Sequence, residues 1–232
     1  MAIGIKLHIW GEYACFTRPE MKVERVSYDV ITPSAARGIL SAIHWKPAMN
    51  WIIDRIHVLK PIRFESIRRN ELGGKIPLNN VKKAIKSKSV QGLYTLIEED
   101  RQQRAATVLK EVAYIIEAHI QLNHEFIKQH PRIGNEDNIG KHLGIFTRRV
   151  RDGQCFQQPC MGVREFPANF ALIEENKLLP VCELPENERS RDFGWMLHDI
   201  DFAHGNPPHF FRAEMTNGII EIPPFRAAEV KS

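Results

Sequence analysis

The 232-residue sequence lacks any apolar run long enough for a membrane-spanning helix, which needs about 18 residues. Its first residues also lack a basic region followed by an apolar stretch and a cleavage site, the pattern of a secretory signal. We therefore expect a protein that neither spans a membrane nor is secreted, and we expect it in the cytoplasm.

Cysteine is scarce, and its four residues are Cys15, Cys155, Cys160 and Cys182. A chain of this size without a secretory signal is expected in a reducing compartment, so free thiols are predicted. Cys155 and Cys160 are too far apart in sequence for a CxxC ligand pair, and no neighbouring Cys or His completes a zinc site. We expect no metal ion and no cofactor.

Several common catalytic motifs are also missing, among them the P-loop, GxGxxG, GxSxG and HExxH patterns. The acidic residues form no clear cluster of the kind that two-metal nucleases use. Kinase, dehydrogenase, peptidase and two-metal nuclease functions are therefore disfavoured.

What the sequence does contain is a concentration of positive charge in its middle. Residues 55–110 carry 13 Lys and Arg against 5 Asp and Glu, a net charge of +8. The preceding segment carries +1 and residues 111–232 carry −5. Such a segment favours a polyanionic partner, because each neutralised phosphate releases condensed counterions. A solvated basic loop is the alternative interpretation.

Alternating hydrophobicity predicts strands at residues 3–9, 55–64 and 112–122, and a strand-like segment at 163–173. A helix over residues 105–116 competes with the third of these, but the dense β-branched and aromatic residues there favour a strand. In the second strand, the alternation places cations and His57 on the side away from the apolar residues.

Two helices are predicted. Thr32 is suited to the N-cap and Pro33 to the first position of a helix that should span about residues 33–46. The second helix is marked by an apolar stripe at helical spacing, formed by Ile139, Leu143, Phe146 and Val150.

The resulting order β-α-β-β-α-β predicts an α+β fold with a ferredoxin-like (RRM-like) domain over residues 1–173. A basic insertion is expected at about residues 70–100, where the pattern is too weak to assign structure. Residues 174–232 are expected to form a small antiparallel β domain, with a hairpin turn at Asn217-Gly218. A ferredoxin-like sheet leaves one face free of helices, and nucleic-acid binders often use that face.

RNA can be cleaved without a metal by its own 2′-OH, given a base, an acid and a cation for the phosphorane. His44, Trp45 and Lys46 place an imidazole, a stacking ring and an ammonium within one turn, although His44 as a helix cap is an alternative. His119 lies on the strand face opposite Tyr114, where it has either a catalytic or a structural role. His8 and His57 are weaker candidates, His57 because neighbouring cations would depress its pKa. The other histidines are interpreted as surface or loop residues: His124, His130, His142, His198, His204 and His209.

Five stretches, in this order, resemble one protein family: RGILSAIHWKP (37–47), YIIEAH (114–119), QCFQQP (154–159), REFPANF (164–170) and GWMLHDIDF (194–202). This is the Cas-five family of CRISPR subtype I-C, the Dvulg type, and the similarity runs nearly end to end. The resemblance implies metal-independent cleavage of precursor CRISPR RNA at the base of each repeat hairpin. It also implies that the protein then stays on the 5′ handle, with other subunits of the surveillance complex.

Family catalysis is attributed to a Tyr in the helix-one motif and an adjacent Lys-His pair on a later strand. By resemblance these positions are His44, Ala118 and His119. A Tyr-to-His change preserves acid or base chemistry, whereas Lys-to-Ala removes the neighbouring cation. Lys46 and Arg104 are candidates to replace that cation in space.

We therefore predict a metal-independent endoribonuclease whose catalytic residues are His44, His119 and Lys46. The predicted RNA-binding residues are Trp45, Arg55, Arg63, Arg68, Arg69, Lys75, Arg101 and Arg104. A subunit that only binds and caps the guide RNA is the second hypothesis, favoured by the missing Lys at position 118. A non-specific nucleic-acid binder, with duplex DNA as a possible partner, is the third.

Overall fold

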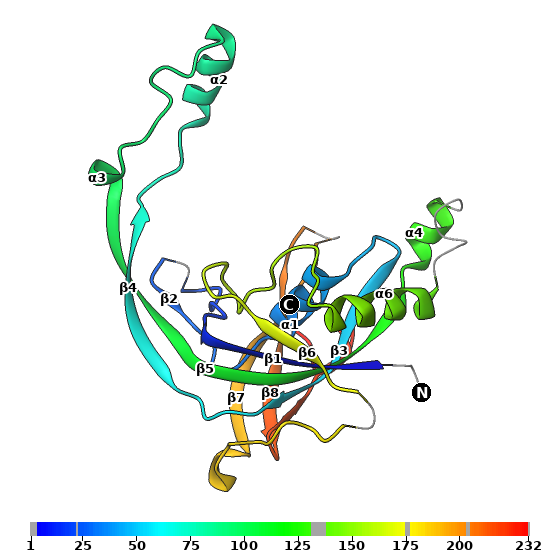
Figure 1. The fold of residues 1–232 in the computed structure, drawn as a ribbon. Coiled ribbons are helices and arrows are strands. Elements are labelled where there is room, and N and C mark those ends of the chain that lie inside the picture. Colours follow the sequence, from blue (N-terminus) through cyan, green and yellow to red (C-terminus); the bar gives the residue numbers. More distant parts are fainter. Residues whose placement is uncertain (1–3, 22, 131–137, 175–176, 203–204, 232) are drawn as a thin grey trace.

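In the computed structural model, which describes residues 4–21, 23–130, 138–174, 177–202 and 205–231, a large, mainly antiparallel sheet carries helices on one face (Figure 1). Nine strands of this described part belong to the sheet. The elements in chain order are β1 (Gly4–Ala14), β2 (Arg25–Val26), α1 (Pro33–Ile43), β3 (Met49–Val58), β4 (Phe64–Leu72), α2 (Leu78–Ser87), α3 (Ile97–Asp100), β5 (Arg101–Leu122), α4 (His124–Gln129), α6 (Ile139–Arg151), β6 (Asn169–Leu172), the 3-10 helix η1 (Glu186–Glu188), β7 (Arg191–Ile200), β8 (Pro208–Thr216) and β9 (Ile219–Glu221).

The predicted ferredoxin-like core is confirmed by six of these elements: β1, α1, β3, β5, α6 and β6. Their strands lie in the order β6-β1-β5-β3, and β5 is antiparallel to both of its neighbours. Each helix therefore joins two strands that run parallel to each other, with an antiparallel strand between them. The short β2 and the longer β4 are additions that pair with β5.

Helix α1 begins as predicted but ends earlier than predicted. The Thr32 side chain accepts a hydrogen bond from the Ala35 amide at 3.2 Å, which satisfies one amide of the first turn. The helix ends at Ile43 rather than near residue 46, because His44 adopts an extended conformation with φ −153° and ψ 124°. This early end turns His44 toward the protein interior.

The core between the sheet and the helices is apolar. Phe146 of α6 is fully buried, and its ring centroid lies 4.8 Å from that of Trp51 on β3. The predicted stripe on α6 is wrong at one end, since Ile139 is 37% exposed while His142 is buried. Ile139 is the first residue of the helix, so its side chain lies beyond the part that packs on the sheet.

The predicted second strand is in fact parts of two strands. β3 starts earlier, at Met49, and ends at Val58, and the chain passes Pro61 before β4 begins at Phe64. β5 is a single strand of 22 residues, so the helical alternative for residues 105–116 is wrong. Its first half pairs with β4 to form a ribbon that extends from the body of the protein (Figure 1).

The basic insertion lies at the far end of this ribbon, where Figure 1 shows α2 and α3. The sequence pattern is too weak to predict regular structure there, yet Leu78–Ser87 form a helix. No residue of α2 is buried. The insertion is therefore solvent-exposed and adds no side chain of α2 to the core.

The last three strands extend the same sheet, because β9 pairs with β3 and β8 pairs with both β7 and β9. The predicted hairpin is confirmed, with Asn217 at φ 53° and Gly218 at φ 79°, the left-handed pair that a tight turn needs. Phe211 and Met215 belong to the same hydrophobic cluster as Leu7 of β1. The division at residue 173 stays a prediction, and the described residues on both sides of it share one hydrophobic cluster.

Other expectations concern smaller features. The predicted strand at residues 163–173 is reduced to Asn169–Leu172, and Ile3 lies outside the described residues. All four cysteines are free, as predicted. Among the described helices, none has the length and apolar composition needed to cross a bilayer.

Candidate active site

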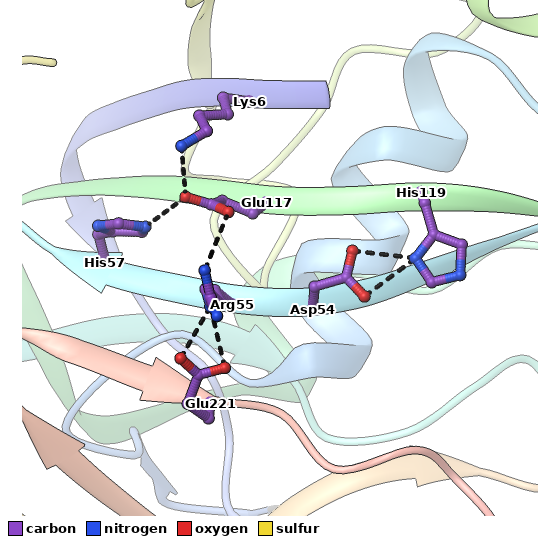
Figure 2. A network of polar contacts seen from close by, with 7 residues as sticks. All are labelled: Lys6, Asp54, Arg55, His57, Glu117, His119 and Glu221. Carbon is purple, nitrogen blue, oxygen red and sulfur yellow. Dashed lines mark hydrogen bonds and ion pairs between the residues drawn. The ribbon is translucent and has the colours of Figure 1, made fainter. Parts of the chain in front are cut away.

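The face of the sheet opposite α1 and α6 carries a row of polar side chains from β1, β3 and β5 (Figure 2). Along β5, Ile116 and Ala118 are buried in the core beneath the helices. Because side chains alternate along a strand, Glu117 and His119 point to the opposite face. We call this the open face. RNA is expected to bind on this face.

His119 is held on the open face by Asp54. Its Nδ1 lies 2.9 Å from each oxygen of the Asp54 carboxylate. Asp54 reaches it because the pairing register shifts between Ile53 and Arg55, which makes Asp54 an extra residue in the strand, a β-bulge. The side chains of His119 and Asp54 are 28% and 43% exposed, so a substrate can reach the pair.

Glu117 is the centre of a second group of contacts. It accepts hydrogen bonds from Lys6 Nζ at 2.8 Å and from His57 Nε2 at 2.9 Å. Partial burial raises the pKa of Glu117, but the hydrogen bonds from Lys6 and His57 outweigh it and leave the pKa below its ordinary value. The expectation that His57 lies amid cations leaves out its hydrogen-bond partner, which is a carboxylate.

Arg55 connects this group to the last strand. Its guanidinium donates to both oxygens of Glu221 at 2.8 and 3.0 Å and lies 4.0 Å from Glu117. The open face therefore carries two cations, Lys6 and Arg55, on the strands that flank β5 (Figure 2). Both are partly neutralised by carboxylates.

His44 is placed differently from what the sequence suggests. It is 1% exposed, and its Nε2 lies 3.1 Å from Nδ1 of His142 in α6. Its carbonyl oxygen accepts a hydrogen bond from the Trp51 indole at 2.9 Å. His44 and His119, both predicted to be catalytic, do not lie together, because His44 packs on the helix-covered side and His119 faces the opposite side.

The other two aromatic and cationic candidates near α1 are exposed. Trp45 is 51% exposed, and Lys46 lies in the turn that leads into β3. Arg104 was a candidate for the missing cation, but it lies 15 residues from His119 along β5, a path of about 50 Å at 3.3 Å per residue. Arg104 is therefore too far away for that role, and the catalytic role of Lys46 stays a prediction.

Most of the predicted RNA-binding cations lie on the ribbon of β4 and β5 or at its far end. Arg69 and Arg104 are paired in register, and both lie close to Glu71, at 3.5 and 4.0 Å. Arg69 also forms an ion pair with Glu165. Three of these predicted RNA-binding cations are exposed: Arg68, Lys75 and Arg101. Their contacts with RNA stay predictions.

Arg63 lies apart from this group, just before β4. It donates a hydrogen bond to Glu111 at 3.2 Å, and the side chain is 62% exposed. Its predicted contact with RNA likewise stays a prediction.

Two residues that contact the candidate histidines, His142 and Asp54, are missed by sequence reasoning. The interpretation of His142 and His198 as surface or loop residues is wrong, because they are 1% and 8% exposed and lie in α6 and β7, while His204 lies outside the described residues. Asp54 was not singled out at all. A signal for it existed, because two polar residues separate the apolar Ile53 and Ile56 and break the alternation of a regular strand.

No three His, Cys, Asp or Glu side chains in the described part of the chain gather in a way that suits a metal ion.

Residues 4–223 match the family described as CRISPR-associated protein (Cas_Cas5). The chain belongs to this Cas5 family. A curated Cas5 relative from Mannheimia succiniciproducens, named CRISPR pre-crRNA endoribonuclease Cas5d, is 69% identical over 231 residues, which cover 100% of both chains. A relative of the same name from Thermus thermophilus is 37% identical over 238 residues, which cover 94% of this chain and 91% of its own.

Solved structures agree with the fold of the Cas5 family. A crystal structure of a CRISPR-associated protein has a TM-score of 0.68 at 22% identity and covers 100% of this chain and 97% of its own. A chain of a CRISPR RNA-guided surveillance complex has a TM-score of 0.52 at 12% identity, with 95% and 91% covered. At these identities the comparison supports the fold, and the two closer relatives support the family.

Proposed function

We propose that this chain binds precursor CRISPR RNA in the cytoplasm and cleaves it at the base of each repeat hairpin. It then holds the 5′ handle as a subunit of the subtype I-C surveillance complex. The observation that carries this proposal is the 69% identity, over the whole chain, to a protein named CRISPR pre-crRNA endoribonuclease. The open face adds an accessible imidazole on a sheet of the type that binds RNA.

The proposed chemistry is metal-independent attack by the 2′-OH of the RNA on the adjacent phosphate. His119 is the proposed base, because its side chain is reachable on the open face while His44 is buried. Lys6 and Arg55 lie on the same face, and the RNA phosphate is proposed to take the place of their carboxylate partners, Glu117 and Glu221. His44 is proposed to have a structural role at the junction of α1 and α6.

A second candidate function is binding without cleavage. Ala118 stands at the position where the resemblance implies a Lys, and it is 1% exposed in the core beneath the helices. A cation therefore cannot come from that position in this chain. The binding-only function follows if Lys6 and Arg55 do not replace it.

Incubation of the purified protein with the repeat RNA of its own locus, with and without EDTA, tests the proposal. We expect a single cut in both conditions and a 2′,3′-cyclic phosphate at the new end. A matched RNA with one 2′-deoxy nucleotide before the cut site should bind equally and stay whole, because it lacks the nucleophile.

Three outcomes would contradict different parts of the proposal. Retention of tight, selective binding without any cut would support the capping function. Cleavage that stops in EDTA would exclude the metal-independent mechanism. Equal affinity for repeat RNA and an unrelated duplex across a salt titration would instead indicate a non-specific binder.

Neutral substitution of Arg68, Arg69 and Lys75 by Gln is expected to weaken RNA binding and to flatten its salt dependence. Each lost phosphate contact should lower the slope of log affinity against log salt by roughly 0.7 to 0.9. The measurement is a filter-binding or fluorescence titration at several salt concentrations.

A matched control replaces three exposed cations elsewhere, Arg191, Arg212 and Arg226, by Gln. It makes the same change in net charge, so it separates local contacts from the overall field. An equal slope in the two triple variants would show that the ribbon makes no phosphate contacts of its own.

A further inference from the structure

We propose that Asp54 is a positioning residue that fixes the tautomer and orientation of His119 for cleavage. The inference rests on the proposed function, in which His119 is the base. Figure 2 shows the Asp54 carboxylate directed at one ring nitrogen of His119, with the other ring nitrogen turned away from it. Both carboxylate oxygens lie 2.9 Å from Nδ1.

The strand is built to bring Asp54 to this place. In a regular strand, two successive core residues are separated by one residue, whose side chain points to the open face. Ile53 and Ile56 are successive core residues, but two residues separate them. The bulge inserts a second one, so Asp54 and Arg55 both lie outside the core while Ile53 and Ile56 are buried. Bulges commonly redirect side chains in this way beside active sites.

The contact determines which nitrogen of His119 carries the proton. An ionised carboxylate only accepts hydrogen bonds, so Nδ1 must be the protonated donor. In the neutral ring, Nε2 then has a free lone pair, which is the state that a general base requires. The carboxylate also stabilises the imidazolium that forms once the proton has been taken.

The proton and bond changes follow from this arrangement. Nε2 of His119 takes the proton of the 2′-OH as the 2′-oxygen forms a bond to phosphorus. The bond from phosphorus to the 5′-oxygen breaks, and that oxygen takes a proton from water. The imidazolium later returns its proton to water, which restores the neutral ring.

The charged groups around His119 are few in the described structure. Asp54 from β3 is its hydrogen-bond partner, and Glu117 is the next residue of β5 on the same face. Glu117 is itself bound by Lys6 from β1. The β1 residue opposite His119 is Gly4, which has no side chain to compete for the ring. Asp54 is thus the group that orients the imidazole.

The test is the Asp54→Asn variant in the full-length protein. We expect the single-turnover cleavage rate to fall by about 100-fold. This is less than the roughly 10,000-fold loss that the same Asp-to-Asn change causes in the serine protease triad. Affinity for the repeat RNA should stay within about twofold, because the loss lies in the chemical step. Asp54→Glu, which keeps a carboxylate, should recover part of the rate.

A second readout separates positioning from a structural role. The ring ¹⁵N resonances of His119, identified by their absence in His119→Ala, should show a protonated Nδ1 and a free Nε2 in the wild type. In Asp54→Asn they should shift toward the other tautomer, since an amide can donate to Nδ1. Asp192→Asn makes the same chemical change at a carboxylate that is paired with Arg212 on β8. That control should alter neither the rate nor the tautomer.

The outcomes distinguish the inference from the proposed function. If His119→Ala cuts RNA at the wild-type rate, the base is wrongly assigned and the proposed mechanism fails. If His119→Ala is inactive but Asp54→Asn keeps the wild-type rate and tautomer, the positioning role of Asp54 alone is overturned. The positioning role would also be overturned if Asp54→Asn lowered both the melting temperature and the cleavage rate but left the tautomer of His119 unchanged.

Discussion

Replacement of His119 by Ala is expected to lower the single-turnover rate of repeat RNA cleavage by about 100- to 10,000-fold. A positioned general base typically contributes an acceleration of this size. Because the side chain is 28% exposed and sits on the sheet surface, its removal should leave the fold intact. RNA affinity should change little, so the effect should appear in the rate at saturating protein rather than in binding.

The matched control for this variant is His124→Ala. His124 is an exposed histidine at the start of α4, just after the end of β5. Its loss should leave cleavage unchanged. Cleavage by His119→Ala at the rate of the wild type would refute the role of His119 as base.

His44→Ala must be interpreted together with a stability measurement. Its side chain is buried and contacts His142, so truncation leaves a cavity and disturbs a buried polar contact. We expect a lower melting temperature. A lower cleavage rate at a temperature where the variant is fully folded would support a catalytic role for His44. An unchanged rate would support the structural role.

Phe146→Ala is expected to destabilise the protein by about 3 to 5 kcal/mol, the usual cost of truncating a buried aromatic residue. Phe146 is fully buried and packs against Trp51, so the surrounding side chains cannot easily fill the space. Chemical denaturation monitored by fluorescence measures the effect, since Trp51 lies beside the new cavity.

Ile139→Ala on the same helix provides the comparison. Its side chain is 37% exposed at the first residue of α6, so we expect a loss near the roughly 0.5 kcal/mol typical of surface sites. Similar losses in both variants would show that α6 does not pack on the sheet as described.

Much of the fold was predictable because local patterns and tertiary packing agree. The Thr32 cap, the alternation in β5 and the turn at Asn217-Gly218 each have a short-range physical cause that the sequence displays. The end of the first helix was not predictable to the residue, because His44 leaves the helix to reach His142, a partner 98 residues away.

The candidate site was only partly predictable for a related reason. His119 was identified through its motif, and strand alternation placed it on the correct face. Its partner Asp54 lies at a bulge that puts both Asp54 and Arg55 on the open face, and the only local sign of that bulge is the break in alternation between Ile53 and Ile56. The separation of His44 from His119 depends on the sheet lying between them, which is not a local feature of the sequence.

The length of β5 has a consequence for how long an RNA must be to engage the whole protein. Arg101 begins the strand at the far end of the ribbon, and His119 lies 18 residues further along, a path of about 60 Å at 3.3 Å per residue. An RNA that touches both must reach across a distance of up to that length. The two ends of the RNA then bind as two linked ligands. Their joint affinity depends on the length and stiffness of the nucleotides that connect them. A short fragment is held at one end only, and loses the gain that simultaneous engagement provides.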